Sequence, residues 1–387
     1  MTLPPDPCGS GTAPGGRPLR IVLHLDVLQC GGLEKKVMHL ALGLDRSRFE
    51  PMVTWSAVWG SIGDRLSEAG IPTPRLKINE RTLLTATAQL HDLQADIFHS
   101  FSCHKNDLDV RAATNAGVPR IVTNRGNVRH WDEEGRLRSW EADRNRATHA
   151  ITACSNAVGW VCRNVERVPW SKIAVLYNGV AIPQHCDRSQ SIREELGIAA
   201  GATLLGYVAN YRAVKNHDVL LHAFRRVRRA RPDACLVCCG GDVFQEGRGL
   251  PALVSKLGLE RSVNLLGARQ DIDAVYRGLD LYVHASQSEG LSNAILEAMA
   301  HGLPVVATSA GGIGEAVEEG VTALLVPPGD ERALAEAILS LLSNDERRRR
   351  FGREGRARAM RLFTLPAMID AYSRFYEGLA GRAGEAG

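Results

Sequence analysis

The chain has 387 residues, too long for a typical single core and suited to two domains of about 150 to 200 residues each. Hydrophobic residues make up 44% of the chain and charged residues 23%, which is typical of globular proteins and excludes a wholly disordered chain. The net charge of only +4 gives no support for a nucleic-acid partner. Because no run of about 18 apolar residues is present, no transmembrane helix is expected.

The first 18 residues are rich in Pro and Gly and contain no apolar core of a signal peptide. We predict that residues 1–18 form a disordered tail. Among the nine cysteines, Cys235, Cys238 and Cys239 lie in an apolar run, and no second pair follows at zinc spacing. We interpret these three as buried strand residues. A set of reduced cysteines predicts a cytoplasmic protein.

The first domain is predicted over residues 19–183 as strands that alternate with helices. Residues 20–25 form a short, branched apolar run that is typical of a buried parallel strand. A loop with two glycines follows, and apolar residues then recur at helical spacing from Leu33 to Leu44. Further strands are expected at residues 52–55, 97–99, 121–123, 149–152 and 173–177. This alternation predicts a parallel sheet with helices on both faces.

The same pattern restarts after the turn signal Asn178-Gly179. Residues 184–201 are predicted to be a linker, and residues 202–363 a second domain. Its strands are expected at residues 203–208, 234–239, 263–266, 279–284, 304–307 and 323–326, with a last helix at 364–379. The predicted fold class is therefore α/β, with two facing, Rossmann-like, doubly wound domains. Their strand carboxyl ends would offer a ligand cleft between the domains.

The most informative stretch is residues 286–312, SQSEGLSNAILEAMAHGLPVVATSAGG. Glu289 lies at a predicted turn from strand to helix, and Ser292 or Asn293 can cap the helix that follows. The free amides at such a helix start can hold a phosphate. Glu289 and Glu297, eight residues apart, can accept hydrogen bonds from sugar and ribose hydroxyls. The stretch therefore predicts a site for a phosphate and a sugar.

This stretch resembles the retaining glycosyltransferases of family four, also called glycosyl transferases group one. The family pattern is Glu, seven residues, Glu, then EAMAxGxPVVAT and GGxxE. The matching residues here are Glu289, Glu297-Ala298-Met299-Ala300, Gly302, Pro304 and Gly311-Gly312-Ile313-Gly314-Glu315. The resemblance spans residues 19–376 and implies the glycosyltransferase-B fold, with the last helix packed back on the first domain. It also implies transfer of a sugar from a nucleoside-diphosphate sugar to a hydroxyl, without a bound metal or other cofactor.

By this resemblance, Glu289, Lys215 and Arg212 are the catalytic candidates. A lysine at a helix start suits a diphosphate leaving group because it places a point charge beside it. The family often has an arginine five residues before this lysine, where this chain has Asn210, and Arg212 is the candidate replacement. The candidate donor-binding residues are Glu297, Gly290, Leu291, Ser292, Asn293, Gly31, Gly32 and Arg269.

The first domain supplies candidates for the sugar or acceptor site. Gly31 and Gly32 match a family loop in which a missing Cβ lets a ligand approach the backbone. The segment DIFHSFSCHKN resembles a family segment with three histidines, of which His99 and His104 are present and the middle one is Phe101. Arg125 follows the next strand and is a candidate for contact with donor phosphates or with an acidic acceptor. Ser155 is interpreted as a helix cap.

Two alternatives share this sequence pattern: a sugar-nucleotide epimerase on the same fold, and a non-catalytic sugar-nucleotide binding protein. The set of Glu289, Glu297 and Lys215 favours transfer. We expect UDP-sugar rather than GDP-sugar as donor, and a glycan or lipid-linked acceptor in the synthesis of cell-surface glycan, lipopolysaccharide or glycolipid. Residues 127–146 mix arginines with two tryptophans and five acidic residues, which predicts weak peripheral contact with the inner membrane face.

Overall fold

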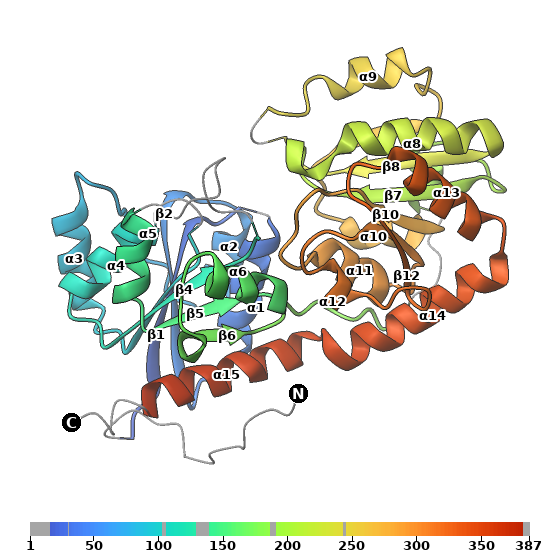
Figure 1. Cartoon of the computed structure of the whole chain (residues 1–387). Helices are drawn as coiled ribbons and strands as arrows, with labels where there is room; N and C mark the ends of the chain where they lie inside the picture. Colours follow the sequence, from blue (N-terminus) through green and yellow to red (C-terminus); the bar gives the residue numbers. More distant parts are fainter. Residues whose placement is uncertain are drawn as a thin grey trace.

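The computed structural model describes residues 16–29, 31–102, 106–128, 139–185, 191–242 and 245–381. Two parallel six-stranded sheets, each with helices on both faces, form two domains that lie side by side (Figure 1). The predicted α/β class with two doubly wound domains is confirmed. Within the described ranges, the structure contains no helix with the length and apolar character needed to cross a bilayer. Most of the predicted tail, residues 1–15, lies outside these ranges.

The first sheet has the strand order β2-β1-β3-β4-β5-β6. Its strands are β1 (Leu19–Val27), β2 (Phe49–Val58), β3 (Ile97–Ser100), β4 (Arg120–Arg125), β5 (Ala150–Ala153) and β6 (Ile173–Val175). The helices of this domain are α1 (Gly32–Gly43), α2 (Ser61–Glu68), α3 (Leu83–Asp92), α4 (Asn106–Asn115), α5 (Ser139–Ala147) and α6 (Asn156–Asn164), with the 3-10 turn η1 (Trp170–Lys172). Both faces of the central strands are buried, which is why their sequences are continuously apolar.

The second sheet has the strand order β12-β11-β10-β7-β8-β9. Its strands are β7 (Thr203–Val208), β8 (Ala234–Cys239), β9 (Val263–Gly267), β10 (Leu281–His284), β11 (Val305–Thr308) and β12 (Ala323–Val326). The helical elements are η2 (Ala213–Lys215), α8 (His217–Ala230), α9 (Leu250–Lys256), α10 (Ile272–Gly278), α11 (Asn293–Ala300), α12 (Ile313–Ala316), α13 (Glu331–Leu342) and α14 (Asp345–Leu362). All three cysteines lie in β8, where Cys238 and Cys239 are buried as interpreted from the sequence, whereas Cys235 is only half-buried.

The strand order reverses once in each sheet, between β1 and β3 in the first and between β7 and β10 in the second. At such a point the connections leave the carboxyl ends of adjacent strands in opposite directions and open a crevice that binds ligands. The Gly31-Gly32 loop follows β1, Lys215 follows β7, and Glu289 follows β10. The topology alone therefore assigns these predicted site residues to the two crevices.

The predicted linker, residues 184–201, contains the short helix α7 (Ser191–Glu195). Ile192 is buried, and Arg193 donates to the carbonyl of Gly278 at 2.8 Å, so α7 packs on the second domain. The last helix, α15 (Leu365–Gly381), continues from α14 along one side of both domains (Figure 1). Its Tyr372 and Tyr376 join the core beside α1, which ties the end of the chain to the first domain.

Candidate active site

Three glycine-containing loops pack closely where the domains meet. A Cβ on Gly290, in the turn between β10 and α11, would lie 2.2 Å from the carbonyl oxygen of Gly126 in the first domain. A Cβ on Gly312, which precedes α12, would lie 1.8 Å from the carbonyl oxygen of Gly290. Gly311 has a φ of +53°, which favours glycine, and a Cβ there would meet the carbonyl of Glu289 at 1.9 Å. Only glycines allow this approach of backbones, which brings the predicted turn against the first domain.

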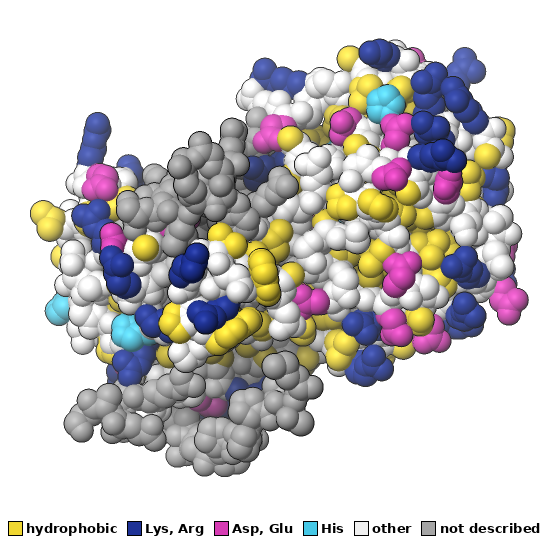
Figure 2. Space-filling view, viewed as in Figure 1, with side chains coloured by type: hydrophobic (Ala, Val, Ile, Leu, Met, Phe, Trp, Pro, Cys, Tyr) yellow, Lys and Arg dark blue, Asp and Glu magenta, His cyan; other side chains and the backbone are white. Residues whose placement is uncertain are grey.

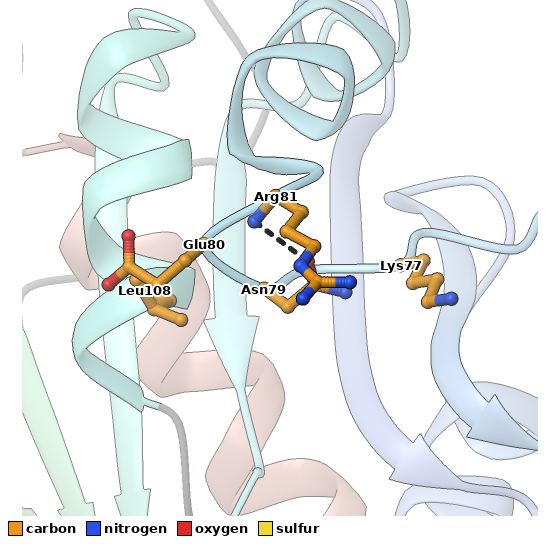
Figure 3. A pocket seen from close by; sticks show the side chains of 5 residues that line it. All are labelled: Lys77, Asn79, Glu80, Arg81 and Leu108. Carbon is orange, nitrogen blue, oxygen red and sulfur yellow. Dashed lines mark hydrogen bonds between the residues drawn. The ribbon is translucent and has the colours of Figure 1, made fainter.

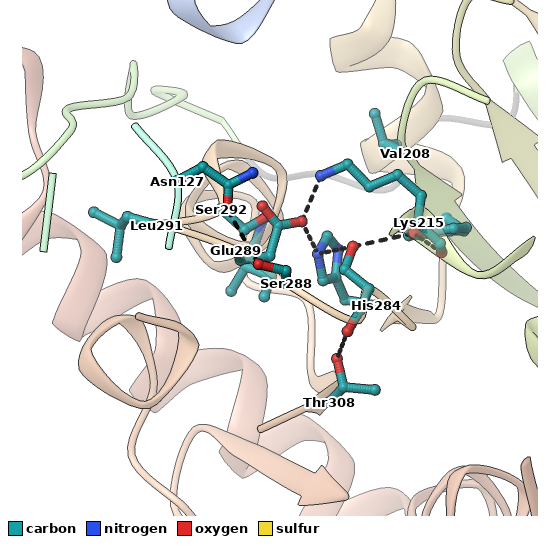
Figure 4. A network of polar contacts seen from close by, with 12 residues as sticks. Asn127, Val208, Lys215, His284, Ser288, Glu289, Leu291, Ser292 and Thr308 are labelled. Carbon is teal, nitrogen blue, oxygen red and sulfur yellow. Dashed lines mark hydrogen bonds and ion pairs between the residues drawn. The ribbon is translucent and has the colours of Figure 1, made fainter. Parts of the chain in front are cut away.

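Glu289 is held between a lysine and a histidine (Figure 4). Lys215 Nζ donates to Glu289 Oε1 at 2.5 Å, and His284 Nε2 lies 2.8 Å from the same oxygen. Glu289 is only 8% exposed, and burial alone would raise the pKa of its carboxyl group. The positive charge of Lys215 and the hydrogen bond from His284 outweigh burial and hold that pKa well below its usual range. Glu289 is therefore ionised at neutral pH.

His284 has a clear role in this network, although no sequence motif pointed to it. Burial lowers the pKa of its imidazole, so the ring is neutral at pH 7. Because ionised Glu289 can only accept, we assign the ring proton to Nε2 from the hydrogen-bond network. Tyr282 Oη, which donates to the carbonyl of Val208 at 3.3 Å, lies 3.2 Å from Nδ1. His284 and Lys215 thus both contact Oε1 of Glu289.

Lys215 is positioned by its backbone at the end of η2. The hydroxyl of Tyr207 donates to the carbonyl of Lys215 at 2.6 Å, and Asn216 then adopts a left-handed conformation with a φ of 49° before α8 begins. Arg212 lies at the start of the same turn. Its guanidinium is 3.6 Å from the carboxylate of Glu246, and its side chain is 44% exposed. Lys215 therefore points at Glu289, whereas Arg212 pairs with the neighbouring loop.

The start of α1 and the start of α11 meet across the domain interface. Asn293 Nδ2 donates to the carbonyl of Gly32 at 3.1 Å, and Asn178 Nδ2 donates to Asn293 Oδ1 at 2.7 Å. Ser292 caps α11, with its Oγ accepting from the amide of Ile295 at 3.4 Å. Two helix N-termini that face one another combine their free amides and the positive ends of their dipoles. This arrangement suits a diphosphate.

Glu297 lies one turn into α11 and lines a pocket of about 420 Å³ between the domains. Its carboxylate accepts a hydrogen bond from the hydroxyl of Tyr276 at 2.8 Å. Arg269, expected near the donor base, is not among the residues that line this pocket, whereas the next residue, Gln270, is. The guanidinium of Arg269 instead binds both carboxylate oxygens of Glu195, at 2.5 and 3.0 Å, which joins α7 to the loop after β9.

The assignment of His99 to the sugar site is wrong. Its ring is fully buried in β3, with Nδ1 2.9 Å from the hydroxyl of Tyr376 and Nε2 3.1 Å from Thr152 Oγ1. Burial lowers the pKa of this imidazole well below its usual value, so the ring is neutral. Both nitrogens are used inside the protein, and His99 anchors α15 to the first sheet. His104 lies outside the described residues.

Arg125 was also placed at the ligand site by the sequence, and this expectation is wrong as well. Its side chain is 3% exposed, and Nε donates to Glu166 at 3.1 Å while Nη2 donates to Asn145 at 2.9 Å. Arg144 adds a second ion pair to Glu166 at 3.2 Å. Burial would raise the pKa of Glu166, but the two arginines lower it to about 2. Arg125 therefore joins β4 to α5 and to the segment that follows α6 inside the first domain.

Glu315, the last residue of the GGxxE motif, connects the domains. Its carboxylate accepts hydrogen bonds from the amides of Asn156 and Ala157, at 2.7 and 2.8 Å, and from the hydroxyl of Tyr177 at 3.0 Å. The second domain thus supplies an acidic cap to α6 of the first domain, next to the cap from Ser155 that the sequence predicted. A further polar contact across the interface runs from Ser288 Oγ to Asn127 Oδ1 at 3.1 Å.

A separate hollow of about 400 Å³ lies in the first domain between the segment before α3 and the start of α4. Figure 3 shows its lining of Lys77, Asn79, Glu80, Arg81 and Leu108. None of the predicted site residues lies in it. The chemistry-bearing side chains gather instead where the two domains meet.

Comparison with known proteins identifies the family. Residues 188–358 match the family model of glycosyl transferases group 1, and residues 30–182 match the model of glycosyltransferase family 4. The two matches lie in the second and first domains and together cover most of the chain. The chain belongs to this glycosyltransferase family, which confirms the resemblance drawn from the Glu289 to Glu315 motifs.

Individual relatives match over part of their length. The D-inositol 3-phosphate glycosyltransferase of Corynebacterium urealyticum is 33% identical over 189 residues, which cover 46% of this chain and 45% of that protein. The N-acetyl-alpha-D-glucosaminyl L-malate synthase of Bacillus anthracis is 28% identical over 209 residues, which cover 54% of each protein. The chain spans about half the length of the curated relatives it matches.

Solved structures match over nearly the whole chain. HepE from Anabaena, in complex with UDP and glucose, has a TM-score of 0.79 and 23% identity, and covers 92% of this chain and 98% of that chain. WaaG, a glycosyltransferase involved in lipopolysaccharide biosynthesis, has a TM-score of 0.74 and 18% identity, and covers 92% of this chain and 99% of that chain. At these identities the likeness establishes the fold, which is the glycosyltransferase-B fold.

Proposed function

We propose that the protein is a retaining glycosyltransferase that moves a sugar from a nucleoside-diphosphate sugar to a hydroxyl acceptor. The observation that carries this proposal is the convergence of Lys215, ionised Glu289 and two facing helix starts at the domain interface. We favour UDP-sugar over GDP-sugar as donor. HepE, which shares the fold, has been solved with UDP and with UDP-glucose, and this supports the uridine choice.

In the proposed reaction, the bond between the anomeric carbon and the diphosphate breaks as positive charge develops on the sugar ring. The leaving diphosphate gains negative charge, which Lys215 and the amides at the start of α11 would stabilise. A well-placed donor of this kind contributes roughly 2.7 to 4 kcal/mol of transition-state stabilisation in a water-poor site. Ionised Glu289 would accept hydrogen bonds from sugar hydroxyls, and Glu297 from the ribose. Attack of the acceptor hydroxyl on the face that the diphosphate leaves, with the hydroxyl proton passing to an oxygen of the departing phosphate, would retain the anomeric configuration.

The acceptor is proposed to be a glycan or lipid-linked hydroxyl, used in the synthesis of cell-surface glycan, lipopolysaccharide or glycolipid. The fold shared with WaaG, which is involved in lipopolysaccharide biosynthesis, is consistent with this class. We propose a cytoplasmic location with weak peripheral membrane contact. On the face drawn in Figure 2, Lys and Arg side chains are mixed with Asp and Glu, which fits weak rather than strong attraction to an anionic surface. Much of the stretch expected to make this contact, residues 129–138, lies outside the described residues.

A donor screen tests the proposal. The full chain would be incubated with UDP-, GDP- and ADP-sugars, with and without EDTA, while nucleotide release is measured with cell-envelope lipid extract as acceptor source. We expect one donor to be consumed, EDTA to have no effect, and turnover to fall at least about 100-fold in Glu289→Gln and Lys215→Met. Arg225→Gln, an exposed change on α8, is the matched control and should keep full activity.

The screen also separates the two alternatives. An epimerase would convert a donor sugar to its epimer without acceptor and without a requirement for net release of nucleotide. A non-catalytic binding protein would bind a nucleotide sugar and leave it intact under all conditions. Either result would contradict the proposed transfer reaction.

A further inference from the structure

Two tryptophans of the first domain are exposed next to one another. Trp160 on α6 is 58% exposed, and Trp170 at the start of η1 is 50% exposed. A Cβ on Gly159, the residue before Trp160, would lie 3.5 Å from the ring of Trp170, so this ring rests against α6 beside Trp160. Neither tryptophan lines either of the two cavities described above. Two adjacent aromatic side chains left half in water indicate a surface that another molecule covers.

The exposed charges around these tryptophans are basic. Arg163 lies about one turn after Trp160 on α6, Arg167 follows that helix, and both side chains are exposed. Within the described ranges, neither arginine forms an ion pair. The only acid between residues 148 and 182 is Glu166, whose carboxylate is buried and paired inside the domain. This part of the surface therefore combines aromatic rings with positive charge that has no counter-ion.

The surface adjoins the interface between the two domains. Glu315 of the second domain accepts from the amides of Asn156 and Ala157 at the start of α6. Trp160 lies four residues after Asn156, about 6 Å along the helix axis. Hydrophobic side chains and Lys or Arg side chains lie together in Figure 2 over the part of the first domain where Figure 1 draws α6 and β6. A molecule bound here would therefore lie near the entrance to the interdomain site.

This composition fits the head-group region of an anionic lipid bilayer. A tryptophan ring has an apolar body and a polar N–H group, and it settles where a membrane meets water. Arginine side chains bind the phosphates of anionic lipids, and each one near such a surface strengthens binding by about fivefold. A bilayer also needs no shaped groove, which agrees with tryptophans that lie outside both cavities.

We propose that the surface formed by Trp160, Arg163, Arg167 and Trp170, the aromatic–basic face, docks on an anionic lipid membrane. The inference deepens the proposed function and rests on it in one respect, because a lipid-linked acceptor gives this docking its use. Docking through this face holds the interdomain site beside the membrane that contains the acceptor. The contact is thereby assigned to α6 and η1 rather than to residues 127–146, the stretch selected from the sequence.

Flotation with lipid vesicles tests this face without any need for turnover. The full chain would be mixed with vesicles of phosphatidylcholine alone, or of phosphatidylcholine and phosphatidylglycerol in equal parts. We expect binding to the anionic vesicles only, and a weaker affinity as salt is added. Trp160→Ser should weaken binding at least about tenfold, and Arg163→Gln about fivefold. Leu84→Ser, an 85% exposed position on α3, and Arg225→Gln on α8 are the matched controls and should bind as the unaltered chain does.

Several results would overturn the inference. These are no binding to either vesicle, equal binding to both, or equal affinity in Trp160→Ser and the unaltered chain. A loss of binding in Trp131→Ser but not in Trp160→Ser would return the contact to residues 127–146. Self-association of the chain that Trp160→Ser abolishes, without vesicle binding, would identify a second copy as the molecule that covers this face.

Two comparisons keep the outcomes distinct. Thermal unfolding of each variant shows whether a loss of vesicle binding reflects a loss of fold, and Arg163→Gln keeps the test decisive if Trp160→Ser is unstable. Vesicle binding through this face by a chain that turns over no donor would contradict the proposed function alone. Donor turnover without vesicle binding would contradict only the aromatic–basic face.

Discussion

Loss of the Glu315 carboxylate is expected to weaken closure of the two domains. Three backbone or hydroxyl donors and the side-chain amide of Asn156 converge on this carboxylate from the first domain, at 2.7 to 3.0 Å. Loss of a helix cap costs about 1 kcal/mol, and a hydrogen bond to a charged group contributes about 1.5 to 3 kcal/mol. Because water replaces these partners when the domains separate, we take a net cost of about 2 kcal/mol for Glu315→Ala.

A cost of about 2 kcal/mol corresponds to a shift of about 30-fold in the ratio of closed to open molecules. The effect should reach the active site, because Gly312, three residues before Glu315, donates its amide to the carbonyl of Glu289 at 3.2 Å. Small-angle X-ray scattering should show a larger radius of gyration for Glu315→Ala, and the dissociation constant of the donor should rise. Glu318→Gln is the matched control, since Glu318 is exposed and pairs only weakly, at 3.9 Å, with Arg358. Unchanged scattering and unchanged donor affinity in Glu315→Ala would show that this carboxylate does not hold the domains closed.

Three further predictions concern stability and packing. Glu166→Gln should destabilise the protein by about 3 kcal/mol at pH 7, because it leaves two buried arginines without their carboxylate. The pKa of Glu166 is depressed to about 2, so its carboxylate stabilises the fold above about pH 4.5 and loses this effect as the pH falls toward 2. The unfolding free energy, measured with urea at pH 7 and at pH 3, should therefore differ less in Glu166→Gln than in the unaltered chain. Equal losses of unfolding free energy in the two proteins would contradict the assignment. Gly290→Ala should reduce turnover at least about 100-fold with little change in melting temperature, because the new Cβ would clash with the carbonyl of Gly126 only when the domains are closed. Gly378→Ala is the control and should leave turnover and melting temperature unchanged, because a Cβ there would lie in open space. His99→Ala should lower the unfolding free energy by about 2 kcal/mol yet keep turnover within about tenfold; a selective loss of turnover without destabilisation would restore a ligand role for His99.

The strands of both sheets could be predicted from the sequence because each one is a short run of β-branched and other apolar residues between turns. The turn at Glu289 was also predictable, since an acid, a glycine and a capping serine adjoin one another in the sequence. Lys215 could be selected because it stands directly before an amphipathic helix. In these cases the functional residue and the element that positions it are neighbours in the chain, so the local sequence pattern is enough to predict the position of the residue.

The errors arose where partners are distant in sequence. His99 lies in a strand buried on both faces, so the alternation that would show which way its ring points is absent. Arg125 follows its strand as a ligand-binding residue would, but its partner Glu166 is 41 residues away. Glu315 caps a helix whose first residue is 159 positions earlier, and no local signal joins the two. His284 had no motif, and only the fold brings it beside Glu289.

In the proposed reaction Lys215 stabilises the departing diphosphate, and single-turnover kinetics of Lys215→Met measure this effect. With the donor that the screen identifies, we expect the rate of the chemical step to fall by about 10²- to 10³-fold while the donor dissociation constant changes by less than about tenfold. A slower chemical step with nearly unchanged donor affinity means that the lysine stabilises charge that develops in the transition state. An unchanged chemical step, or a loss confined to donor binding, would contradict the claim.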